Sequence, residues 1–213
     1  GGYVNAKTDA GGPTKYGITH KTLAAHRGVP SVTPAQVKAL TIKEAEDIYR
    51  QSYWGPSGGD VLPSGLDYAC FDYGVNSGPP RAVKTLQKVL GVKQDGWVGG
   101  DTLKAVKDYP GGSIQLIADY CGARMDFLRS LTGQRGFPSN GRGWTIRVTG
   151  KDPKGEWKDQ PGVIGNALAM AAKQPVAKTP ANKFVSAKVD DEMSAKAEPG
   201  ALQAYLKPEV LLP

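Results

Sequence analysis

The segment that decides the fold reads Gly1-Gly2-Tyr3-Val4-Asn5, passes through Asp9, and reaches Gly11-Gly12-Pro13-Thr14-Lys15-Tyr16-Gly17-Ile18-Thr19. Its Gly-Gly and Gly-Pro pairs are typical of turns. The valine, tyrosine, threonine and isoleucine residues between them suit short β-strands. We therefore expect a small β-hairpin here, and its glycines would let a ligand come close to the backbone.

The rest of the chain up to residue 172 predicts helices. Apolar residues recur at helical spacing, and Thr33-Pro34 and Thr41-Ile42-Lys43-Glu44 are typical of helix starts, the latter as a capping box. The predicted helices cover residues 21–26, 34–40, 42–54, 66–73, 79–90, a short stretch from 101, 113–131 and 163–172. We expect loops at 141–144 and 161–164, and a turn at 95–100 that buries Trp97.

Composition limits the function. The net charge is +7 and most of it lies in residues 1–150, so a basic face could attract polyanions such as nucleic acid or the bacterial cell wall, or could simply keep the protein soluble. Cys70 and Cys121 lie in apolar helical stretches; two buried free thiols are the favoured interpretation, and one disulfide is the alternative. No zinc spacing and no apolar run of membrane-spanning length is present, so we expect no metal, no other cofactor and no membrane span.

The first segment resembles a known glycosidase active site, and this resemblance points to glycosidic chemistry. Cutting a glycosidic bond needs a protonated carboxylic acid and a second group that stabilises the oxocarbenium ion or holds a water molecule. The order Asp9, Thr14, Tyr16-Gly17-Ile18 resembles the active-site segment of glycoside hydrolase family 108, lysozyme-like N-acetylmuramidases of the endolysin and secretion-activator type. In that family the catalytic glutamate stands directly before the Gly-Gly-Tyr, so the resemblance places the general acid just upstream of Gly1. The absence of an initiator methionine leads us to expect that the natural N-terminus lies further upstream.

Other motifs extend the resemblance. Residues 41–54 are similar to the capped helix of these lysozymes, and Phe71–Gly78 to their central helix and the turn after it. Residues 82–103 resemble the predicted peptidoglycan-binding domain that follows this module, although they could equally well only support the catalytic lobe. The resemblance thus implies a mainly α, lysozyme-like α+β fold: a helical bundle with a small N-terminal β-hairpin. Its segments would be a catalytic module at 1–78, lacking the family's first helix, a helical wall-binding region at 79–172, and a linker and tail at 173–213.

The resemblance also gives the candidate site residues. Asp9 would be the second catalytic group, with an Asx-turn residue as the alternative, and Thr14 would hold the attacking water unless it is a plain strand hydroxyl. Tyr16 would line the cleft or the core. Asn76 would bind an N-acetyl sugar or cap a helix, and Trp54 would stack on a sugar ring or pack in the core. Asp72, in contrast, is expected to be a buried, hydrogen-bonded helix residue.

Two functions follow from these features. The leading hypothesis is a peptidoglycan hydrolase that cuts glycan strands at the cell wall, in the periplasm or outside the cell, with a phage-encoded or virion-associated origin left open. The alternative is a non-catalytic wall-binding or structural component of a phage particle or secretion apparatus, whose 173–213 tail binds a protein partner. Nucleic-acid binding is not favoured, because basic residues do not cluster with aromatic ones.

Overall fold

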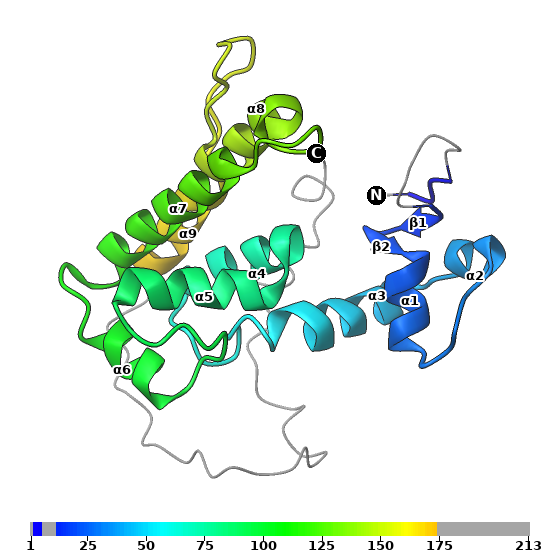
Figure 1. Cartoon of the computed structure of the whole chain (residues 1–213), viewed down its shortest axis with the longest axis horizontal. Helices are drawn as coiled ribbons and strands as arrows, with labels where there is room; N and C mark the ends of the chain where they lie inside the picture. The colour runs from blue at the N-terminus through cyan, green and yellow to red at the C-terminus, as the bar shows by residue number, and fades with distance from the viewer. Residues whose placement is uncertain (1, 6–11, 174–213) are drawn as a thin grey trace.

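The computed structural model describes residues 2–5 and 12–173 (Figure 1). The mainly helical fold with a small N-terminal sheet, predicted from the sequence, is confirmed. The elements are β1 (Thr14–Lys15), β2 (Ile18–Thr19), α1 (His20–His26), α2 (Pro34–Lys38), α3 (Ile42–Tyr49), the π-helix η1 (Arg50–Trp54), α4 (Leu66–Ser77), α5 (Pro79–Leu90), α6 (Gly100–Lys107), α7 (Gly112–Ser130), α8 (Phe137–Thr149) and α9 (Gly162–Lys173).

The hairpin and helices α1 and α2 form one end of the molecule (Figure 1). Strands β1 and β2 are antiparallel, with Thr14 opposite Thr19. The turn between them uses positive φ at both Tyr16 (52°) and Gly17 (76°), the backbone shape of a two-residue hairpin turn that matches strand twist. From this end, α3 and η1 lead toward the larger helical part.

Helix starts in this region follow the sequence with one change. Thr33 and Gln36 form a complete capping box at the start of α2. At α3, Thr41 accepts a hydrogen bond from the Glu44 amide as predicted (3.2 Å), but the Glu44 carboxylate binds Arg27 at 2.7 and 2.9 Å. This side chain therefore ties α1 to α3 and does not complete the predicted capping box.

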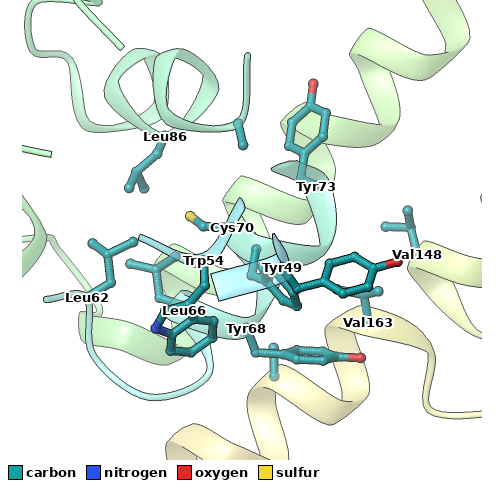
Figure 2. Packing of buried hydrophobic residues seen from close by; sticks show 14 of the residues in the cluster. Tyr49, Trp54, Leu62, Leu66, Tyr68, Cys70, Tyr73, Leu86, Val148 and Val163 are labelled. Carbon is teal, nitrogen blue, oxygen red and sulfur yellow. The ribbon is translucent and has the colours of Figure 1, made fainter. Parts of the chain in front are cut away.

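Helix α4 lies at the centre of the larger part and packs against α5, α7 and α9. Figure 2 shows side chains from α3, η1 and α4 meeting Leu86 of α5, Val148 of α8 and Val163 of α9. One continuous apolar cluster runs from Ile18 to Ala167, so segments 1–78 and 79–172 share a core. The division into these segments stays a prediction about sequence modules, and residues 174–213 of the tail segment lie outside the described residues.

Two loop predictions and one cysteine prediction can be compared with the structure. The predicted loop at 141–144 is wrong because these residues lie within α8, while α9 begins at Gly162, inside the other predicted loop. In α8, a Cβ at Gly141 would lie 2.7 Å from the Phe137 ring, so the small residue lets that ring pack over the helix. Cys70 and Cys121 are buried free thiols, as favoured, and burial raises the pKa of each to about 12.

The Asp67 carboxylate in the first turn of α4 predicts a pH-dependent stability. It accepts hydrogen bonds from the Gly65 and Tyr68 amides at 2.8 and 2.6 Å, yet burial outweighs them and raises its pKa from 3.8 to about 6. A carboxyl whose pKa is higher in the folded state than in the unfolded state stabilises the fold most at low pH, and that contribution is lost as pH rises through about 6. We expect lowering the pH from 7 to 5 to raise the contribution of this group to the free energy of unfolding by at most about 2 kcal/mol.

Urea unfolding at both pH values measures this effect. Asp67→Asn should reduce the difference in the free energy of unfolding between pH 5 and pH 7. Asp47→Asn, on the exposed face of α3, should leave that difference unchanged. An unchanged pH dependence in Asp67→Asn would show that another group is responsible.

Candidate active site

Thr14, the predicted water-holding residue, lies in the middle of the N-terminal hairpin. Its backbone pairs with Val4 through two hydrogen bonds, N–H of each to C=O of the other, at 2.8 and 2.9 Å. Its half-buried hydroxyl donates to the Gly12 carbonyl at 2.9 Å. Because a hydroxyl oxygen keeps acceptor capacity while it donates, this geometry orients Thr14 without excluding a hydrogen bond from water.

Asp9, the predicted catalytic carboxylate, lies outside the described residues. The backbone on its two sides is described, and the Val4–Thr14 pairing joins these two ends.

Tyr16 contributes to the site through its backbone as well as its ring. Its carbonyl accepts a hydrogen bond of 2.9 Å from the Tyr49 hydroxyl, which anchors the hairpin turn to α3. A Cβ at Gly17 would collide with that same hydroxyl, so glycine is needed there both for its φ and for space. The half-buried Tyr16 ring packs against the core with the Lys15 amine 5.0 Å from its centroid. Lys15 also donates to the Lys38 carbonyl at 2.7 Å and so ties the hairpin to α2.

Asn76 is exposed in the last turn of α4. Its side-chain carbonyl accepts a hydrogen bond from the Ser77 hydroxyl at 3.0 Å. The residue that caps the C-terminus of α4 is Gly78, with φ of 87°. Asn76 is therefore not the helix cap, which was the alternative to sugar binding. An exposed amide at a helix end is free to approach a polar ligand.

Trp54 requires a correction. It is 4% exposed, its ring packs edge-on against Phe71 at 5.5 Å, and its indole N–H donates to Asp60 at 2.9 Å. Gly59 lies against the ring so closely that a Cβ there would overlap it. A ring covered in this way offers no face to a sugar, so Trp54 belongs to the core.

A hollow of about 390 Å³ lies beside the hairpin end of the molecule. Its walls come from α1 and the connection after it: His20, Lys21, Ala24, Ala25, Val29, Pro30 and Ser31. Of the predicted site residues that the structure describes, none lines this hollow.

A buried charge cluster joins α4 to α7 and α8. Asp72 is 1% exposed and binds Arg124 at 2.7 Å and Arg147 at 2.7 and 3.2 Å. Burial acts to raise the pKa of Asp72, but the two arginines outweigh it and hold the pKa below its ordinary value. Asp72 therefore stays ionised and cannot donate a proton, which confirms its predicted structural role. In the sequence, Arg124 belongs to a helical stripe, and Arg124 and Arg147 resemble closing elements of the predicted peptidoglycan-binding domain, but nothing in the sequence indicated that they pair with Asp72.

No metal centre is built from the described residues: within 2–5 and 12–173, no three His, Cys, Asp or Glu side chains gather as ligands would. The helices of the same residues are also too short or too polar to cross a bilayer.

Comparison with known proteins identifies the family. Residues 1–78 match the Glycosyl hydrolase 108 family, and residues 81–149 match the Predicted Peptidoglycan domain. The solved structure of SagA from Brucella abortus is 44% identical, with a TM-score of 0.67, and the alignment covers 80% of this chain and 88% of that one. No curated protein matches the sequence. The two matched modules support a peptidoglycan-active protein, and the chain belongs to the Glycosyl hydrolase 108 family.

Proposed function

We propose that the protein is an N-acetylmuramidase, which hydrolyses the bond between N-acetylmuramic acid and N-acetylglucosamine in peptidoglycan. The observation that carries this proposal is the match of residues 1–78 to the Glycosyl hydrolase 108 family. The hairpin geometry supports it, because the Thr14 hydroxyl is oriented by its hydrogen bond to the Gly12 carbonyl.

The proposed mechanism divides the work between two carboxyl groups. A glutamate directly ahead of Gly1 protonates the leaving oxygen, as the family resemblance implies. The Asp9 carboxylate stabilises the positive charge that develops on the sugar, and Thr14 holds the attacking water. Tyr16 and the exposed amide of Asn76 contact the substrate. Asp72 takes no part, since its arginine partners keep it ionised and buried.

The test is digestion of purified peptidoglycan by the full-length protein, including the residue that precedes Gly1. Reduction of the products followed by mass spectrometry identifies which sugar carries each new reducing end. New ends on N-acetylmuramic acid are the expected result. New ends on N-acetylglucosamine would contradict the proposed bond, and no new ends from a folded protein would contradict the enzyme.

A second candidate function is wall binding without cleavage. The match of residues 81–149 to the Predicted Peptidoglycan domain favours it. Sedimentation with insoluble peptidoglycan, without release of sugar, would support this function. Action at the cell wall is common to both candidates; a phage or virion origin and a protein partner for the 173–213 tail stay predictions.

A further inference from the structure

Trp97 is the most exposed large hydrophobic side chain of the described residues, at 72%. The sequence predicted a buried ring, so this is a correction. The residue lies in the connection between α5 and α6, within the segment that matches the Predicted Peptidoglycan domain. An indole left in water forgoes a large apolar burial, and tryptophan is enriched at contact surfaces because its ring is apolar and its N–H is polar.

The loop that carries Trp97 is fixed from below by Gln87. This side chain is 1% exposed, and its amide donates to the Asp95 carboxylate at 2.7 Å, the Trp97 carbonyl at 2.9 Å and the Thr102 hydroxyl at 3.2 Å. Its carbonyl accepts from the Gly96 amide at 2.9 Å. The loop backbone is thus held on both sides of Trp97, so little conformational entropy remains to be lost when a ligand binds.

The direction of the Trp97 ring follows from its neighbours. Val98 packs inward, so close to Gly58 that a Cβ there would lie 2.8 Å from the valine methyl. Trp97 precedes it and points outward, with the Cδ1 edge of its ring toward Gly99. Small Gly99 supports that edge while the ring stays largely open to solvent.

One basic side chain lies against the loop that carries this ring. Lys84 on α5 lies against the Gly96 turn, where a Cβ would be 3.3 Å from its Cε atom. Lys88 and Lys93 are also exposed, one on α5 and one two residues before Asp95. An exposed apolar ring on a loop that also contacts the Lys84 side chain is complementary to an amino-sugar ring that carries carboxylates, as muramic acid and its peptide do.

We propose that Trp97 and Lys84 form a second glycan-binding surface, which stacks on a sugar ring of peptidoglycan and pairs with its carboxylates. The identity of the polymer rests on the function proposed above, whereas cleavage is not required. Helix α6, which begins three residues after Trp97, lies at the end of the molecule opposite the hairpin (Figure 1). The surface therefore holds the wall away from the candidate active site and serves as an anchor.

The test measures binding of the full chain to insoluble peptidoglycan by sedimentation. Trp97→Ala should weaken binding about tenfold, the size of a buried aromatic anchor, while Trp97→Tyr should keep most of it. The matched control is Trp157→Ala: this ring is 52% exposed, but its face is used by Arg142 at 5.8 Å, so binding should not change. Lys84→Gln should weaken binding to peptidoglycan and leave any binding to neutral chitin unchanged.

Thermal unfolding of each variant checks that the fold is intact, and release of reducing sugar from a short soluble glycan gives an independent readout. Cleavage by Trp97→Ala at the wild-type rate, with weakened wall binding, is the expected pattern. If neither the wild type nor any variant cleaves glycan but wall binding still depends on Trp97, the hydrolase proposal fails and the glycan-binding proposal stands. The glycan-binding proposal is overturned if Trp97→Ala and Trp157→Ala weaken wall binding equally, or if Trp97→Ala leaves wall binding unchanged. It is also overturned if the wild type does not bind the wall, or if this surface binds a protein in place of glycan.

Discussion

Replacing Asp9 with asparagine should lower the turnover of peptidoglycan by about 10²- to 10³-fold. The carboxylate is proposed to stabilise the positive charge that develops on the sugar, and an amide of the same shape lacks the negative charge that does so. The change should lower turnover far more than stability, because a residue that acts mainly in the transition state adds little to folding. Release of reducing ends at saturating peptidoglycan, compared with the midpoint of thermal unfolding, separates the two effects.

The matched control is Asp95→Ala, another aspartate beside a glycine turn. Asp95 accepts hydrogen bonds from Gln87 and from the Trp97 amide, so its loss should lower stability while cleavage of a short soluble glycan continues. Thr14→Val should lower turnover less than Asp9→Asn, since a water can still enter without its hydroxyl partner. Wild-type turnover in Asp9→Asn would remove this residue from the mechanism and reduce it to a turn former.

The parts of the fold that the sequence predicted are those fixed by local signals. Thr33 and Thr41 mark helix starts through their own hydroxyls, and the glycine-rich hairpin needs positive φ at Gly17 whatever surrounds it. Helix α7 follows an apolar stripe long enough to be recognised without knowledge of its neighbours. These features depend on interactions within a few residues of each other.

The places of the two central tryptophans could not be predicted from the sequence. Trp54, for which sugar stacking and core packing were both open, is covered by Phe71 and Gly59, whereas Trp97, expected inside, is exposed to solvent. Tryptophan suits either place because its ring is apolar and its N–H is polar. Which place it takes depends on distant partners: Asp60 satisfies the indole of one, and Gln87 fixes the loop of the other.

The candidate site was only partly predictable for the same reason. The order of Asp9, Thr14 and Tyr16 is a local pattern, and the family resemblance could be seen there. The anchor of that hairpin, the Tyr49 hydroxyl on the Tyr16 carbonyl, joins residues 33 positions apart and leaves no local sequence signal. The pairing of Asp72 with Arg124 and Arg147 spans 52 and 75 positions.

The Asp72 cluster gives the largest expected effect on stability. Asp72→Asn keeps the volume of the side chain but removes the only charge on this carboxyl group, which both arginines share. Arg124, 1% exposed, would then keep its positive charge in a dry interior. Breaking a buried pair in this way costs about 3–5 kcal/mol, because the remaining charge is not compensated. Urea unfolding at pH 7 measures the loss.

The control for this prediction is Asp126→Asn, which breaks an ion pair with Arg129 on the exposed face of α7. The Asp126 and Arg129 side chains are 78% and 56% exposed, so water replaces the lost contact. The free energy of unfolding should therefore change by no more than about 1 kcal/mol. Adding Arg124→Met to Asp72→Asn should restore part of the stability, since the uncompensated charge leaves with its side chain. If the double variant is no more stable than Asp72→Asn alone, the loss comes from packing at α4, α7 and α8. If Asp72→Asn costs no more than Asp126→Asn, the cluster does not hold these helices together.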